Sequence, residues 1–147
     1  MLKKTACEYF LLLSKLEYAL KNADFVKGND RDNAQPDWDK FFNDVQSKIK
    51  LDIESDDIQE FLNHPPARQL FKGGILSWSK PQKILCSDSR RVLDTCLTIR
   101  NNLFHGGKYG DGNAGRNEVL LSAATKILTS AMNVHPQVKQ NFDLADL

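Results

Sequence analysis

The residues best suited to chemistry in this sequence lie in one eleven-residue run, Thr98 to Lys108. Within it, Arg100 is followed directly by the polar residue Asn101, and four residues separate Arg100 from His105. Arginine grips a phosphate through a planar, two-pronged set of donors. Histidine is the side chain best suited to moving protons near neutral pH. The run therefore indicates chemistry on a phosphodiester.

Helical geometry brings two of these three side chains together. Asn101 and His105 are four residues apart and share a face, one turn apart, whereas Arg100 is offset from Asn101 by about 100°. Leu103 and Phe104 are expected to turn toward the core and leave the polar trio at an accessible edge. An alternative stays open, in which His105 interacts with the last carbonyls of the helix and Arg100 pairs with an acidic residue.

This run resembles the R-x4-6-H motif of the HEPN superfamily, a group of all-helical domains that includes many metal-independent endoribonucleases. The match consists of Arg100, the polar Asn101 directly after it, and His105 at the end of a helix that runs out into glycine. The resemblance implies a bundle of four or five helices with the motif late in the chain. A subset of HEPN toxins has a tyrosine two residues after the histidine; this chain has Gly107 there, and Tyr109 is off register.

The resemblance implies a metal-independent endoribonuclease that cleaves RNA by attack of the 2′-hydroxyl, as a toxin or an antiviral defence effector. His105 would be the proton shuttle, Arg100 would hold and neutralise the phosphate, and Asn101 would orient the histidine or a phosphate oxygen. No metal and no cofactor are expected. One alternative is a non-catalytic HEPN-like module that binds RNA, a nucleotide or a protein partner; another is a plain dimerisation domain.

The expected partners follow from the same chemistry. One chain supplies one such histidine and a two-proton mechanism works better with two, so we expect a homodimer with a composite active site. In the glycine-rich segment after the motif, Lys108 is a candidate for binding RNA phosphate and Tyr109 for stacking on a base. An inhibitor or antitoxin protein is also expected, because a toxic nuclease needs restraint.

The elements that must position these residues are predicted to be helices, because apolar residues recur at three- and four-residue steps. The expected helices are Leu2 to about Asp24, Asp37 to about Ile49, Asp56 to Asn63, Ser87 to about Phe104 and Glu118 to Asn133. A strand or a turn fits Ile75 to Trp78, and Pro136 is expected to end the last helix. The sequence thus predicts a single all-α domain over residues 1–147, a bundle of about five helices with the fourth most buried.

Composition narrows the class of protein. The 147 residues are 41% hydrophobic and 27% charged, as in one globular domain. Residues 1–60 carry nine Lys/Arg and thirteen Asp/Glu, whereas residues 61–116 carry nine and three, so the half that contains the motif is positive and suits an anionic substrate. Three cysteines without C-x-x-C spacing argue against a disulfide framework and a zinc site. No segment has the length of a membrane span, so we expect a cytoplasmic protein with no membrane partner.

Overall fold

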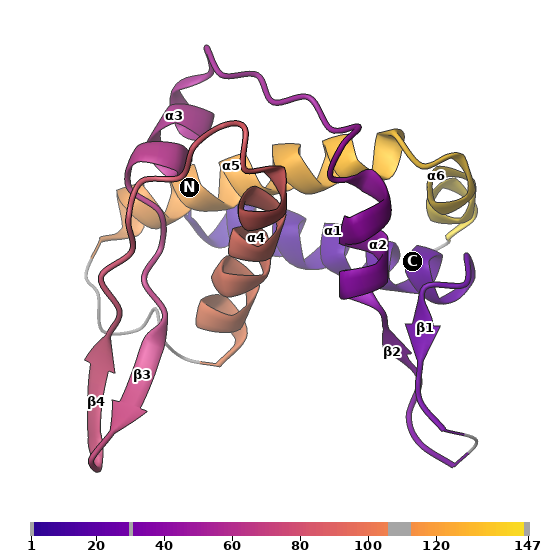
Figure 1. The fold of residues 1–147 in the computed structure, drawn as a ribbon, viewed down its shortest axis with the longest axis horizontal. Coiled ribbons are helices and arrows are strands. Elements are labelled where there is room, and N and C mark those ends of the chain that lie inside the picture. The colour runs from indigo at the N-terminus through magenta and orange to yellow at the C-terminus, as the bar shows by residue number, and fades with distance from the viewer. Residues whose placement is uncertain (1, 30, 106–112, 146–147) are drawn as a thin grey trace.

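The computed structural model of the chain describes residues 2–29, 31–105 and 113–145. This part is mainly helical, as predicted, with two small two-stranded antiparallel sheets (Figure 1). The helices are α1 (Leu2–Lys21), α2 (Trp38–Val45), α3 (Asp56–Asn63), α4 (Ser89–Phe104), α5 (Ala114–Asn133) and α6 (Pro136–Leu144). The strands are β1 (Val26–Lys27), β2 (Gln35–Pro36), β3 (Gln69–Lys72) and β4 (Ile75–Trp78).

Helix α5 lies at the centre of the bundle, where it packs against α1, α3, α4 and α6. The sequence led us to expect α4 in this position, and that prediction was wrong. Helix α5 is suited to it because Ala123, Ala124 and Ala131 are fully buried, and small side chains let neighbouring helices approach closely. The other buried residues of α5 are Asn117, Leu120, Leu121, Ile127, Leu128 and Met132.

The C-terminal helix α6 was not predicted, because Pro136 was interpreted as a stop. Pro136 instead occupies the first position of α6, where its missing N–H would have had no helical partner. His135 caps this helix by accepting the Val138 N–H at Nδ1 (3.3 Å). Its half-buried ring lies edge-on to Phe25, with 5.0 Å between centroids. The surrounding aromatic cluster also includes Trp38, Phe41 and Phe42, so Trp38 has a packing role.

Side-chain caps fix the starts of the other helices. Asp37 caps α2 as predicted, accepting the main-chain N–H three residues on. Helix α4 is capped by Asp88 and not by Ser87, because Asp88 makes the equivalent hydrogen bond. Asn113 caps α5, which therefore begins four residues earlier than the predicted start at Glu118. Helix α2 ends at Val45, before the predicted end.

A β-hairpin projects from the helical body between α3 and α4 (Figure 1). Strands β3 and β4 pair antiparallel around Gly73 and Gly74, whose φ angles of 57° and 76° lie in the left-handed region that glycine favours. Such a two-residue turn matches the natural twist of paired strands. A strand or a turn was expected for Ile75–Trp78, and the structure shows the strand, while its partner β3 was not predicted.

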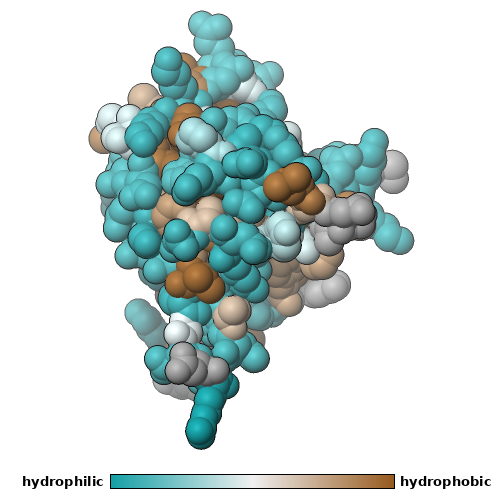
Figure 2. All heavy atoms as spheres, turned by 90° about the vertical axis from the view of Figure 1, so that its right-hand side faces the viewer, coloured by the Kyte–Doolittle hydropathy of each residue, from teal (hydrophilic) through white to brown (hydrophobic). Residues whose placement is uncertain are grey.

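The surface is polar over most of the face formed by α6 and the β1–β2 hairpin, with apolar residues in small separate groups (Figure 2). Elsewhere, large apolar side chains are exposed on the β3–β4 hairpin. A second exposed apolar group consists of the paired rings of Phe10 of α1 and Phe104 of α4. Within the described ranges, no helix is long and apolar enough to cross a membrane.

Asp57 joins α3 to α5 through its carboxylate. Lys126 Nζ and Ser122 Oγ of α5 each lie 2.8 Å from Oδ2. Ser55 Oγ and the Ile58 N–H donate to Oδ1. With 12% of the side chain exposed, burial alone would raise the pKa of this carboxyl. The hydrogen bonds, that from Lys126 foremost, outweigh burial and lower the pKa from 3.8 to about 2.

Asp57→Asn is expected to lower the free energy of unfolding at pH 7 by about 1–2 kcal/mol. Because the pKa is lower in the folded state, the carboxylate stabilises the fold above about pH 4, and this contribution is lost as the pH falls toward about 2. The difference between variant and wild type therefore narrows over that window. Urea unfolding at several pH values measures it, and a difference that stays constant with pH would contradict the interpretation.

Candidate functional site

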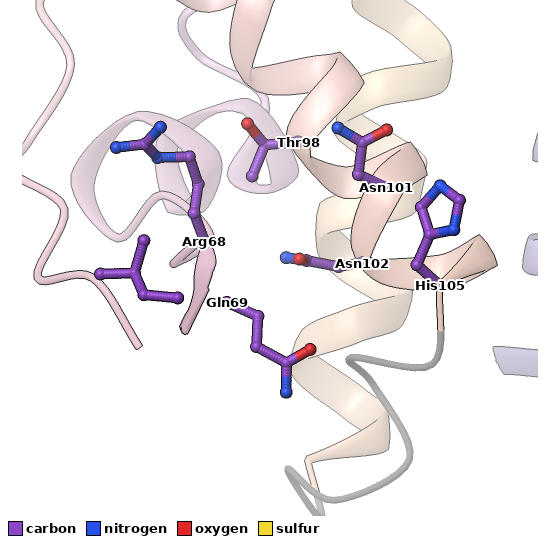
Figure 3. A pocket seen from close by; sticks show the side chains of 7 residues that line it. Arg68, Gln69, Thr98, Asn101, Asn102 and His105 are labelled. Carbon is purple, nitrogen blue, oxygen red and sulfur yellow. The ribbon is translucent and has the colours of Figure 1, made fainter. Parts of the chain in front are cut away.

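A pocket of about 370 Å³ lies where the C-terminal half of α4 faces the start of β3 (Figure 3). One wall consists of Thr98, Asn101, Asn102 and His105, at the i, i+3, i+4, i+7 spacing of a single helix face. The other wall consists of Arg68, Gln69 and Leu70. Of the side chains labelled in Figure 3, those of Gln69, Thr98, Asn101 and Asn102 are uncharged. Arg68 is the one permanent cation among the described residues that line the pocket.

Asn102 holds the two walls together. Its side chain is 5% exposed and points from α4 toward the Arg68–Gln69 segment (Figure 3). Its amide donates to the main-chain carbonyl of Ala67 (2.8 Å), directly before Arg68. The Arg68 N–H donates to Ser79 Oγ (2.8 Å), and the Ser79 N–H returns a bond to the Arg68 carbonyl (2.9 Å). The main chain of Arg68 is thereby fixed by both α4 and the hairpin.

His105 lies at the open end of this pocket. It is the C-terminal cap of α4, its N–H donates to the Asn101 carbonyl (3.0 Å), and its side chain is exposed. Asn101 is also exposed and lines the same pocket one turn earlier. The two side chains that helical spacing places together are therefore together in the structure.

Arg100 points away from this pocket. Its Nε and Nη2 donate to Asn101 Oδ1 (3.2 and 3.0 Å), and its Nη1 lies 3.8 Å from Glu17 Oε1 on α1. The structure thus joins Arg100 to Asn101 but does not place it beside His105. The contact with Glu17 agrees with the alternative in which this arginine pairs with an acidic residue.

The two apolar residues of the motif, Leu103 and Phe104, differ in whether they face the core. Leu103 packs against the core, as predicted. Phe104 does not, because it is 45% exposed and lies edge-on to Phe10 of α1, itself 53% exposed, with 5.9 Å between ring centroids. The prediction that Phe104 faces the core was wrong, and the two rings form an exposed apolar contact beside His105.

Arg68 and Thr98 are pocket residues to which the sequence analysis gave no role. Thr98 could have been found, since it lies on the same helix face as Asn101 and His105. Arg68 could not, because it lies thirty-two residues before Arg100 and reaches the pocket only through the hairpin. Within the described part of the chain, its guanidinium has no acidic partner.

The other candidate residues are not among the described residues that line this pocket. Lys108 and Tyr109 lie outside the described residues. Arg90, at the start of α4, is paired with Asp39 and Asp94. Cys96 is fully buried as predicted, and burial raises the pKa of its thiol. In the ranges that the structure describes, no three His, Cys, Asp or Glu side chains are grouped to hold a metal ion.

Comparison with known proteins found no matching family model, no matching curated protein and no matching solved structure.

Proposed function

We propose that this chain is a metal-independent endoribonuclease of the HEPN type, which cleaves RNA phosphodiesters by attack of the neighbouring 2′-hydroxyl. The observation that carries the proposal is the pocket itself. It brings a histidine, three amides and an arginine without an acidic partner in the described chain to one cavity on an otherwise ordinary helical bundle. A group that moves protons and a group that neutralises phosphate are what this reaction requires.

In the proposed reaction, the 2′-oxygen bonds to phosphorus and the bond from phosphorus to the 5′-oxygen breaks. The products are a 2′,3′-cyclic phosphate and a 5′-hydroxyl. His105 takes the proton of the 2′-hydroxyl or supplies one to the departing oxygen, and Asn101 orients it or a phosphate oxygen. The motif resemblance implies that Arg100 binds the phosphate. The pocket geometry supports Arg68 in that role, with Arg100 holding Asn101 in place through two hydrogen bonds.

We further propose a twofold homodimer that brings two copies of His105 into one composite site, so that one acts as base and the other as acid. Support comes from Phe10 and Phe104, an exposed apolar pair that includes the residue directly before His105 in the chain. Exposed aromatic side chains of this kind are common at the centres of protein interfaces. Sedimentation equilibrium would then give twice the chain mass of 16.7 kDa.

The proposal is tested with a mixed-sequence single-stranded RNA and a copy in which every 2′-hydroxyl is methylated, both incubated with the protein in EDTA. Because the 2′-oxygen is the nucleophile, only the unmodified RNA is expected to be cut. Cleavage of both strands would contradict the mechanism. Roles as a toxin or defence effector, and restraint by an inhibitor protein, are proposed from the motif resemblance alone.

One observation favours a second candidate, a non-catalytic HEPN-like module that binds RNA, a nucleotide or a protein. Arg100, the arginine of the motif, is turned toward Glu17 and away from the pocket. If this ion pair serves only to stabilise the fold, Arg100 keeps its place in the motif but does not bind phosphate. Binding of RNA without cleavage by the wild-type protein would favour this candidate.

A further inference from the structure

The two faces of the β3–β4 hairpin differ in a way that points to a ligand. Cross-strand partners share a face, so the pairs Gln69–Trp78 and Phe71–Leu76 place two aromatic rings on one side. Phe71 is 64% exposed and Trp78 41% exposed. The opposite face carries Leu70, Lys72, Ile75 and Ser77 and has no aromatic residue.

This exposed aromatic face needs an explanation. A two-stranded hairpin is marginally stable, and three large apolar side chains, Phe71, Leu76 and Trp78, are exposed on its aromatic face. Contiguous exposed apolar groups commonly mark an interaction site. The hairpin also projects from the body on the side where α4 ends, and not over the core (Figure 1).

The charge around the hairpin indicates the chemistry of the partner. Residues 65–91 contain six Lys/Arg and one acidic residue, Asp88. Arg68, Lys72, Lys80 and Lys83 have no acidic partner among the described residues. An apolar surface for a protein or for another copy of the chain would not need this excess of unpaired cations, whereas a polyanion with flat apolar groups matches both features.

The cations form a continuous path to the candidate active site. A second pocket of about 370 Å³, lined in part by Arg68, Ser79, Lys80 and Arg91, adjoins the first. Both pockets share Arg68 and Thr98. A chain of phosphates lying along Lys80 and Arg68 would therefore enter the pocket that contains His105.

We propose that the β3–β4 hairpin binds single-stranded RNA, with bases stacked on Phe71 and Trp78 and the backbone lying along Lys80 and Arg68 toward His105. Single strands are the suitable form because their bases are free to leave the stack, whereas those of a duplex are not. The inference rests on the proposed function for the direction of the strand, but binding itself does not require cleavage.

The experiment measures fluorescence anisotropy of a short labelled single-stranded RNA with the full chain carrying His105→Ala, so that the RNA stays intact. Phe71→Ala and Trp78→Ala, made in that background, are each expected to weaken binding about tenfold. Phe71→Leu keeps an apolar side chain but removes the ring, and is expected to weaken binding almost as much. Ile75→Ala, on the opposite face of the hairpin and 68% exposed, is the matched control and is expected to bind like its parent.

Duplex RNA and anionic lipid vesicles are used as further probes, to distinguish single-stranded RNA from other polyanionic partners. Duplex RNA of the same sequence is expected to bind more weakly than the single strand. Equal binding of duplex, unchanged binding of both aromatic variants, or binding of anionic lipid vesicles without binding of RNA would each overturn the inference. Single-strand binding that depends on Phe71, together with no cleavage by wild type, would remove the proposed nuclease activity and leave this inference standing. Cleavage by wild type together with unaltered binding by Phe71→Ala would remove this inference and leave the proposed nuclease activity standing.

Discussion

His105→Ala is expected to lower the rate of RNA cleavage about 10²–10⁴-fold, the usual contribution of a positioned acid or base. The side chain is exposed at the end of α4 and makes no described hydrogen bond of its own. The free energy of unfolding is therefore expected to change by no more than about 0.5 kcal/mol. Initial cleavage rates in EDTA and a thermal unfolding curve measure the two quantities.

His64→Ala is the matched control for this variant. His64 is also an exposed histidine at the C-terminal cap of a helix, α3, but it lines neither pocket beside α4. Its loss is expected to leave cleavage unchanged. If both variants lost activity equally, or neither did, the role given to His105 would be wrong.

Arg68→Ala is expected to reduce cleavage by about 10²–10³-fold, the cost of removing one well-placed donor to a developing charge. Arg68→Lys is expected to restore only part of the rate, because an ammonium lacks the planar two-pronged geometry. Arg31→Ala, which removes an exposed arginine from the loop between β1 and β2, is the control for lost positive charge. Single-turnover rates at saturating RNA separate this effect from weaker binding.

Comparing the cleavage rates of Arg68→Ala and Arg100→Ala shows which of the two arginines binds the phosphate. Arg100→Ala is expected to have a smaller effect, since Arg100 reaches the pocket only through its hydrogen bonds to Asn101. A large loss of cleavage rate in Arg100→Ala, with a near-normal rate in Arg68→Ala, would show that Arg100 binds the phosphate, as the motif resemblance implies. That result would also mean that the ion pair with Glu17 opens when RNA binds.

The parts of the fold that the sequence predicted well are those encoded locally. Helix α3 has the predicted bounds, and Asp37 caps α2, because apolar spacing and capping residues act within a few positions. The errors occurred where one local signal has two meanings. Pro136 fits both the end of one helix and the start of the next, and His135 settles the matter only through its contacts with Phe25 and Phe41.

The candidate site, like the fold, was predictable only where the signal is local in the sequence. Helical spacing alone places Asn101 beside His105, and it would also have placed Thr98 there. Arg68 depends on a tertiary event, the folding of a hairpin around Gly73–Gly74 and its attachment to α4 by the buried Asn102. No spacing within the motif contains that information, and for the same reason the direction of Arg100 toward Glu17 was not predictable.

Analysis of the RNA ends left by the wild-type protein in EDTA, with His105→Ala in parallel, decides whether this chain cleaves RNA through the 2′-hydroxyl. We expect 2′,3′-cyclic phosphates and 5′-hydroxyls from wild type and no comparable products from the variant. Intact RNA with wild type, or ends bearing a 5′-phosphate, would contradict it.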